Sequence, residues 1–326
     1  MKSNKNKVLI ILVVFLFCLN GLIFASGKQK EKVEADKEMI TIGVNLHNVA
    51  MTWMKFAQDA MLEEGENLGI EIIMLDAEND VAKQAANMED LIALQVDGIV
   101  VPPLDVSGLN PAIDSARAAG IPVATFDRAA IGADYIFYVG CDDVKGGRLA
   151  GEFVAEKLNG KAKIIHIYGT PGSSPARDRT KGLHEVVDKY PGMEIVFEQT
   201  GEFFIEKAMQ TMEDALMAVP TFDAVVCQDD NMMLGAIEAM KAAGIDPRSL
   251  VITGYGGFPD GLRAIRDGVA DCSISYPIEM APEVLRRMVD YLRGKSPAEK
   301  DYEIPPIVIT KDNLEEGDFY SMIAND

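Results

Sequence analysis

An acid and an arginine stand side by side at the end of an apolar run, at Asp127 and Arg128. The run over 121–126 is β-prone, and Pro122 fits only at the beginning of a strand. The pair therefore falls where a strand leaves the core, and in open parallel α/β sheets this edge is where ligands bind. An aspartate accepts hydrogen bonds from hydroxyls and an arginine fork donates them, which suits a small polyhydroxylated ligand. The alternative is a strand-end ion pair without a ligand.

Polar and aromatic side chains also follow several other expected strands. Aromatic faces pack on the C–H surface of a sugar ring, and planar polar groups satisfy its hydroxyls. The candidate aromatic platforms are Trp53, Phe203 and Tyr255. The candidate hydrogen-bonding groups are Asp127, Arg128, Arg177 and Asp229. Trp53 and Phe203 could instead belong to the core, and Asp229 could cap a helix. Arg179 is interpreted as a supporting ion pair. The shared place of these residues at strand ends favours a binding site.

The elements that must position these residues follow one pattern from Met39 onward. Short β-prone runs alternate with helical patterns, which is typical of βαβ units on a parallel sheet. We expect eleven strands, near 40–46, 70–75, 98–101, 122–127, 135–140, 162–168, 193–199, 223–227, 249–253, 270–275 and 304–309. A single doubly wound sheet of that size would be unusual, so the length predicts an α/β fold with two sheets of about five or six strands.

The first 27 residues predict an export signal. Lysines precede an apolar run over 8–24, and Ala25-Ser26-Gly27 supplies the small residues that a signal peptidase reads. Cys18 raises the alternative of a lipoprotein, but Phe17 stands where a small residue is wanted, so no lipid anchor is expected. Retention of the run as a membrane anchor is a further alternative. Residues 28–38 are charged and poor in apolar side chains, which predicts a disordered tether. The mature protein is therefore expected in the periplasm or another extracytoplasmic space.

Charge and cysteine content exclude some partners. The formal net charge of −20 disfavours nucleic acid and anionic membranes. Beyond residue 27 the chain has Cys141, Cys227 and Cys272, with no CxxC motif and no histidine spacing typical of zinc sites. These cysteines lie in or beside expected strands and are interpreted as small buried side chains. We therefore expect no cofactor and no bound metal.

No motif predicts an enzyme. The sequence has no GxSxG, HExxH or phosphate loop. Residues 254–259 follow a strand and open a helix, but Pro259 occupies the place of the third glycine of a dinucleotide fingerprint. A turn that brings Tyr255 to the ligand is the preferred interpretation. A transcriptional repressor could use the same kind of two-lobed ligand-binding domain. It would begin with a DNA-binding headpiece, whereas this chain begins with an expected export signal.

The order and spacing of these residues resemble those of the exported sugar-binding proteins of bacterial ABC importers, in particular the ribose-binding type. The segments that carry the resemblance are 99–103, 120–128, 142–151, 176–182, 229–236 and 259–261. The resemblance implies a type I periplasmic binding protein, with two α/β lobes joined by a hinge of three crossings that closes around the ligand. It implies an N-terminal lobe of 39–141 plus 276–304 and a C-terminal lobe of 142–275 plus 305–326.

The ligand-contacting positions carry over with several departures. Asp127, Arg128 and Arg177 match the acid and two arginines of the family, Phe203 and Tyr255 match its aromatic positions, and Trp53 and Met54 fall on a pair of phenylalanines. Gly256 replaces an Asp, Ser275 a Gln and Asp229 an Asn, while His47 and Met51 replace small polar or amide groups. The predicted ligand-binding set is therefore His47, Met51, Trp53, Met54, Asp127, Arg128, Arg177, Phe203, Asp229, Tyr255, Gly256 and Ser275.

The resemblance implies a solute receptor without catalytic activity. It would bind a monosaccharide or polyol and deliver this ligand to the membrane permease of an ABC importer. Because of the departures, we expect another pentose or hexose, a polyol or a cyclitol rather than ribose. The alternative is a receptor for a sugar or a furanose-like signal that reports to a chemoreceptor or a sensor kinase.

Overall fold

The computed structural model describes residues 39–314. The predicted signal peptide and tether, and residues 315–326 of the predicted C-terminal lobe, lie outside this range. The described residues contain two six-stranded sheets, in the strand orders β11-β5-β4-β3-β1-β2 and β12-β10-β9-β8-β6-β7. None of the helices in this range is both long and apolar enough to cross a membrane.

The first sheet is parallel throughout. Its strands are β1 (Thr41–Leu46), β2 (Glu71–Asp76), β3 (Gly98–Val101), β4 (Val123–Phe126), β5 (Tyr138–Cys141) and β11 (Asp301–Ile304). The helices that contact it are α1 (Thr52–Leu68), α2 (Val81–Ala93), α3 (Asn110–Ala118) and α9 (Met280–Leu292). Every residue of β3, β4 and β5 is buried, which explains why their sequences are continuous apolar runs rather than alternating ones.

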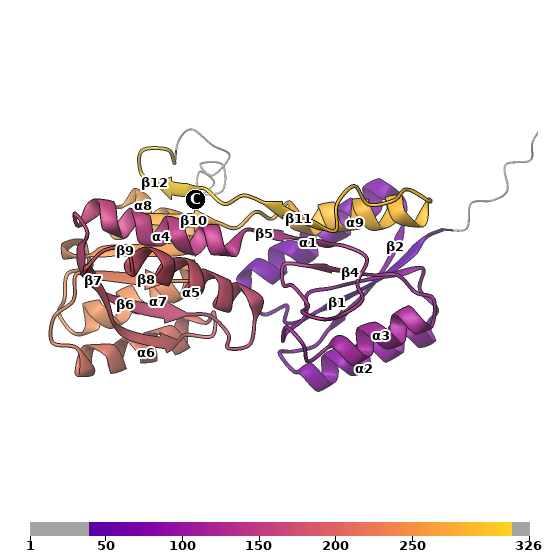
Figure 1. The fold of residues 1–326 in the computed structure, drawn as a ribbon, viewed down its shortest axis with the longest axis horizontal. Coiled ribbons are helices and arrows are strands. Elements are labelled where there is room, and N and C mark those ends of the chain that lie inside the picture. The colour runs from indigo at the N-terminus through magenta and orange to yellow at the C-terminus, as the bar shows by residue number, and fades with distance from the viewer. Residues whose placement is uncertain (1–38, 315–326) are drawn as a thin grey trace, which may run out of the picture. The chain divides into compact units, whose positions relative to one another are not determined.

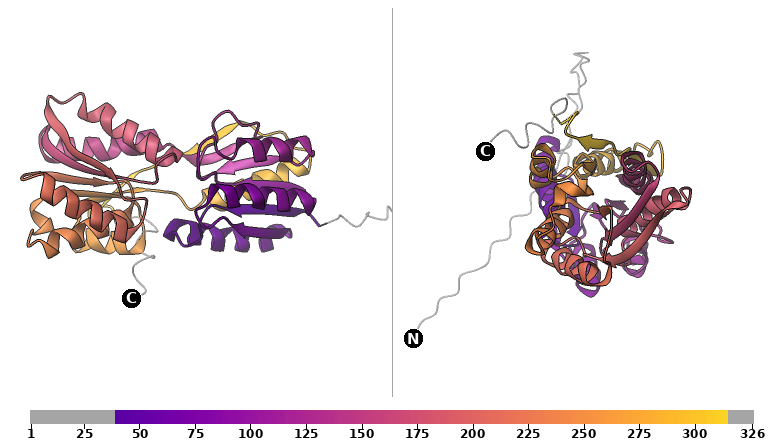
Figure 2. Two further views of the ribbon diagram at one scale, coloured as in Figure 1. Left: turned by 90° about the horizontal axis from the view of Figure 1, so that it is seen from below. Right: turned by 90° about the vertical axis from the view of Figure 1, so that its left-hand side faces the viewer.

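The second sheet is parallel except for β12, which pairs antiparallel with β10. Its strands are β6 (Lys161–Tyr168), β7 (Gly192–Thr200), β8 (Ala224–Cys227), β9 (Val251–Gly256), β10 (Cys272–Ser275) and β12 (Val308–Thr310). Its helices are α4 (Asp143–Lys157), α5 (Ser174–Val187), α6 (Ile205–Ala218), α7 (Asp230–Ala242) and α8 (Pro259–Arg266), with a 3-10 turn at η1 (Pro247–Ser249). Helices lie on both faces of the sheet (Figure 2).

The chain passes between the two sheets three times: after β5, after β10 and after β11 (Figure 1). The expectation of two α/β lobes with mainly parallel sheets is confirmed. The prediction of one strand over 304–309 is wrong, because Pro305 and Pro306 separate β11 from β12 and each strand joins a different sheet. The exact lobe boundaries stay a prediction.

Helices α4 and α5 approach each other closely because glycines face each other across their contact. A Cβ at Gly147 would lie 2.0 Å from the backbone oxygen of Arg179, and a Cβ at Gly182 would lie 2.0 Å from that of Val144. Real side chains do not reach such distances, so both positions need glycine for this packing. The close contact fixes the place of α5, which carries two of the candidate arginines.

We expect Gly147→Ala to lower the free energy of unfolding by about 1–3 kcal/mol, because the added methyl group overpacks the contact between α4 and α5. Denaturation in urea, followed by circular dichroism, measures this change. Glu152→Ala, at an exposed position of the same helix, is the matched control and should change stability little. Equal stability of the two variants would contradict the role of Gly147.

Candidate functional site

A cavity lies at the carboxyl ends of the parallel strands and takes side chains from both lobes. It contains about 410 Å³ of space free of protein atoms, part of which is open to solvent. The lining residues are His47, Met51, Trp53, Met54, Asp127, Arg128, Pro175, Arg179, Phe203, Asp229, Tyr255, Gly256, Phe258 and Tyr276.

Ten of the twelve predicted ligand-binding residues line this cavity; Arg177 and Ser275 do not. Ligand binding by these ten residues stays a prediction. Their convergence on one cavity is what we expect for residues that follow the ends of parallel strands. Sequence reasoning did not assign Pro175, Arg179, Phe258 and Tyr276 to the set. Tyr276 carried a usable signal, since it directly follows the strand that ends at Ser275.

Arg177 points away from the cavity because of the register of α5. The helix begins at Ser174, with the Ser173 hydroxyl accepting a hydrogen bond from the Ala176 backbone N–H at 3.4 Å. Residues two positions apart lie about 200° apart around a helix, so Arg177 and Arg179 face opposite sides. Arg177 is largely exposed and pairs with Asp178 at 2.6 Å. Arg179 is buried and takes the place that was expected for Arg177.

Ser275 is used to hold the third crossing. Its hydroxyl accepts a hydrogen bond from the Ile307 backbone N–H at 2.9 Å, and its own N–H donates to the Ile307 oxygen at 2.9 Å. Because successive side chains of an extended chain point to opposite sides, the next residue, Tyr276, faces the cavity instead. Tyr276 therefore lines the cavity and Ser275 does not.

Asp127 is the acid at the centre of the N-terminal half of the cavity. Tyr276 Oη donates to Asp127 Oδ1 at 2.7 Å, and His47 Nε2 and Arg128 Nε lie 3.4 and 3.7 Å from Oδ2. Burial alone would raise the pKa of Asp127, but the hydrogen bonds and the positive charge of Arg128 outweigh it and lower the pKa. Asp127 is therefore ionised and can only accept hydrogen bonds.

His47 and Arg128 each keep one buried polar atom without a partner. Burial, followed by the charge of Arg128, lowers the pKa of His47 to about 4, so the ring is neutral. Its Nε2 faces ionised Asp127 and carries the proton, which leaves Nδ1 as an acceptor with no partner. Arg128 Nη1 donates to the Leu104 oxygen at 3.1 Å, and its Nε–H makes no hydrogen bond. Both residues line the cavity, so its lining residues carry one unpaired acceptor and one unpaired donor.

Arg179 is held by the C-terminal half of the cavity. Its Nε donates to Asp143 Oδ1 at 2.7 Å and its Nη1 to the Gln228 oxygen at 2.7 Å. The guanidinium lies 3.7 Å from the ring centre of Tyr255 and 4.5 Å from that of Tyr276. Burial disfavours its charge, but Asp143 and the two tyrosines raise the pKa of Arg179, so it stays a cation. The predicted ion pair is confirmed, and Arg179 lines the cavity as well.

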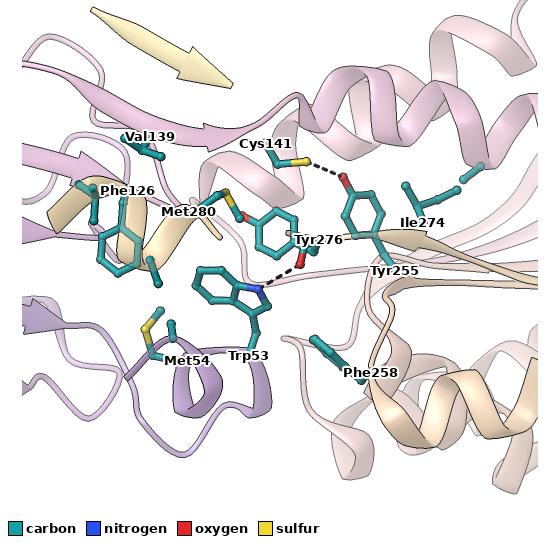
Figure 3. Close-up of a cluster of buried hydrophobic side chains, with 14 of the residues drawn as sticks. Trp53, Met54, Phe126, Val139, Cys141, Tyr255, Phe258, Ile274, Tyr276 and Met280 are labelled. Carbon is teal, nitrogen blue, oxygen red and sulfur yellow. Dashed lines mark hydrogen bonds between the residues drawn. The ribbon is translucent and has the colours of Figure 1, made fainter. Parts of the chain in front are cut away.

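Aromatic rings form one wall of the cavity. The ring centres of Trp53 and Tyr276 lie 5.1 Å apart, and Trp53 Nε1–H donates to the backbone oxygen of Tyr276 at 3.4 Å (Figure 3). Tyr255 lies 5.7 Å from Tyr276 at an angle of 67°. Trp53 is also part of a buried apolar cluster, so the core and cavity interpretations both hold. The wall supplies the apolar surface that a ring of C–H groups needs.

Asp229 caps a helix, as one interpretation of the sequence has it, and it also lines the cavity; its binding of a ligand stays a prediction. Its Oδ1 accepts from the Met232 backbone N–H at 2.9 Å and caps α7, and the residue lines the cavity. Burial, and then the negative charge of Asp230, raise the pKa of Asp229 to about 8. Asp229 makes no ion pair with another residue of 39–314. Nearby, Gly256 has a φ of +131°, and a Cβ there would lie 2.8 Å from the Phe258 ring. The turn in this chain therefore disfavours the Asp that Gly256 replaces.

The three cysteines within residues 39–314, Cys141, Cys227 and Cys272, are buried and form no disulfide, as the sequence predicts. Within residues 39–314, no group of three or more His, Cys, Asp or Glu side chains could hold a metal ion. The absence of a cofactor stays an expectation.

Comparison with known proteins identifies the family to which this two-lobed architecture belongs. A family model described as a periplasmic binding protein domain matches residues 42–296. The chain belongs to this family. Among its relatives, the ribose import binding protein RbsB of Bacillus subtilis is 32% identical over 297 residues, 89% of this chain and 94% of the relative. This periplasmic binding protein family consists of binding proteins of extracytoplasmic compartments.

Solved structures agree with this assignment. An ABC transporter solute binding protein from Bacillus halodurans with bound myo-inositol superposes with a TM-score of 0.81 at 31% identity, covering 85% of this chain and 96% of that one. The fructose-binding periplasmic domain of a hybrid two-component system superposes with a TM-score of 0.81 at 27% identity, covering 85% and 92%. The resemblance of the sequence to a type I periplasmic binding protein is therefore confirmed.

Asp229 should make the stability of this periplasmic binding protein fall as pH rises. Its pKa is about 8 in the folded protein and ~3.9 in an unfolded chain, so the folded state binds the proton more tightly. This contribution is complete below pH ~4 and is lost as pH rises through 8. The variant Asp229→Asn cannot ionise at this position. The difference in free energy of unfolding between the variant and wild type should therefore grow in favour of the variant as pH rises, by at most ~1.4 kcal/mol per pH unit.

Urea denaturation of both proteins at pH 5, 6.5 and 8 measures this difference. The titration of His47 is common to both proteins and cancels in the comparison. Glu238→Gln, at an exposed position of α7, is the control and should follow the wild-type profile. Parallel profiles for Asp229→Asn and wild type would contradict the raised pKa of Asp229.

Proposed function

We propose that this protein is an extracytoplasmic receptor that binds a monosaccharide or polyol in the cavity and delivers it to the permease of an ABC importer. The observation that carries the proposal is the pair of buried atoms without partners, His47 Nδ1 and Arg128 Nε, in a cavity with an aromatic wall. Leaving a buried polar atom unpaired costs about 1–3 kcal/mol, and a ligand hydroxyl would remove that cost.

The mechanism is binding without chemistry. The ligand bridges Asp127 and Arg128 of the N-terminal lobe and Arg179 of the C-terminal lobe, and it stabilises the arrangement in which the lobes meet. The permease then recognises the geometry that only the liganded form presents. None of the lining side chains is assigned a catalytic role, in keeping with a family of binding proteins. Residues 1–27 would direct export and be removed.

A second candidate function differs only in the partner. The structural likeness to a sensory domain of a two-component system favours a receptor that reports to a chemoreceptor or sensor kinase. Neighbouring genes for an ATPase and a permease would support import, and a neighbouring kinase gene would support signalling. The internal binding mechanism is the same in both cases.

The proposed function predicts that at least one monosaccharide, polyol or cyclitol stabilises the purified protein. A thermal-shift screen tests it, with each compound at concentrations from ~10 µM to ~1 mM. A ligand present at 100 times its Kd adds ~2.7 kcal/mol of stability. The compounds are D-ribose, L-arabinose, D-glucose, D-galactose, D-fructose, xylitol and myo-inositol. Trp53 is the one tryptophan of the chain and lines the cavity, so its fluorescence gives a second readout. The proposal fails if no sugar, polyol or cyclitol, with or without an amino group, shifts the melting temperature.

We expect Arg179→Lys to weaken binding by ~1.5–3 kcal/mol, because lysine keeps the charge but loses the planar fork. Lysine is chosen because removing the charge would leave Asp143 buried and unpaired. Titration of a ligand from the screen, followed by Trp53 fluorescence, measures the change. Arg177→Lys, two residues away on the exposed face of α5, is the matched control. Equal affinities of the two variants would argue against a role for Arg179.

A further inference from the structure

The charged groups that line the cavity do not balance once Asp143, which is not part of the lining but pairs with Arg179, is counted with them. Arg128 lies beside Asp127, and Arg179 is paired with Asp143 at 2.7 Å, so these four groups form two neutral pairs. His47 is neutral. Asp229 is the remaining acid of the lining, and it makes no ion pair within residues 39–314. The lining therefore holds one buried carboxyl group that forms no ion pair of its own within the described residues, and its pKa is raised to about 8.

The structure also excludes a local explanation for this acid. As the cap of α7 it accepts from the Met232 backbone N–H, and the Asn231 backbone N–H also acts on it, a task that asparagine performs equally well. The titratable groups that act on it are Asp230 on the same helix, which disfavours its charge, and Arg179 from α5, which favours it but is already paired. Asp127, Arg128 and His47 line the same cavity from the other lobe. An acid here costs stability that an amide would not, unless a ligand uses the charge.

We propose that the ligand carries a protonated amino group that pairs with Asp229, so that the receptor takes an amino sugar, an amino polyol or an aminocyclitol. The ammonium supplies the missing positive charge, and its N–H groups donate to the Asp229 carboxylate. The hydroxyls of the same ligand satisfy His47 Nδ1 and Arg128 Nε at the opposite side of the cavity. This inference rests on the proposed function, because it assumes that the cavity binds a polyhydroxylated compound.

Matched pairs of ligands test the inference. Isothermal titration calorimetry on the purified protein compares D-glucose with D-glucosamine, D-galactose with D-galactosamine, and myo-inositol with an amino-deoxyinositol, at pH 6.5. We expect an amino compound to bind about tenfold or more tightly than its neutral partner, as a charged hydrogen bond allows. If neutral compounds bind and no amino partner binds more tightly, the inference fails and the proposed function stands. If no neutral and no amino compound binds, the proposed function fails with it.

Proton release gives a readout that affinity alone does not. With a pKa of about 8, Asp229 holds a proton at pH 6.5, whereas the amine is already charged. Pairing then expels on the order of one proton, which appears as a dependence of the binding enthalpy on the ionisation enthalpy of the buffer. Asp229→Asn should lose both the proton release and the preference for the amine, while Glu238→Gln on the same helix keeps both. Proton release that persists in Asp229→Asn would overturn the assignment to Asp229.

Discussion

The buried contact between Arg179 and Asp143 is the interaction on which the site depends. Asp143 is the first residue of α4, directly after the first crossing between lobes, and Arg179 is held on α5. The same guanidinium donates to the backbone at the end of β8 and lies over Tyr276, at the second crossing. Breaking such a pair leaves an uncompensated buried charge, at a cost of about 3–5 kcal/mol. One side chain therefore ties the cavity to two of the segments that join the lobes.

Much of the cavity could be predicted because strand ends are readable in a sequence. Continuous apolar runs mark strands buried on both faces, and in a parallel sheet the polar residues that follow them meet at one edge. This argument brought residues as distant as His47 and Tyr255 to a single cavity. It needs only the positions of the strands, which hydrophobic periodicity provides.

What the sequence did not provide was register. Arg177 and Arg179 differ by two residues, and the choice between them depends on where α5 begins, which the Ser173 cap decides. Ser275 and Tyr276 are neighbours whose side chains point to opposite sides. The sequence predicts one strand over 304–309 where the structure has two, β11 and β12. The stretch is β-prone on both sides of Pro305 and Pro306, so the break between the strands was missed. In each case a shift of one or two residues exchanges a buried face for another, and composition does not report such a shift.

The polar lining is tolerated because nearly every buried group has a partner from the protein. Tyr276 Oη donates to Asp127, while the ring of the same residue packs under Arg179, so one tyrosine connects the acid of the first lobe with the arginine of the second. A ligand that contacts Asp127 and Arg179 together stabilises the arrangement in which both meet Tyr276. Such differential stabilisation is what a shift between lobe arrangements requires, since a ligand with equal affinity for both would shift nothing. The atoms left without partners then decide which ligand supplies that energy, and here they are an acceptor, a donor and an acid without a counter-charge.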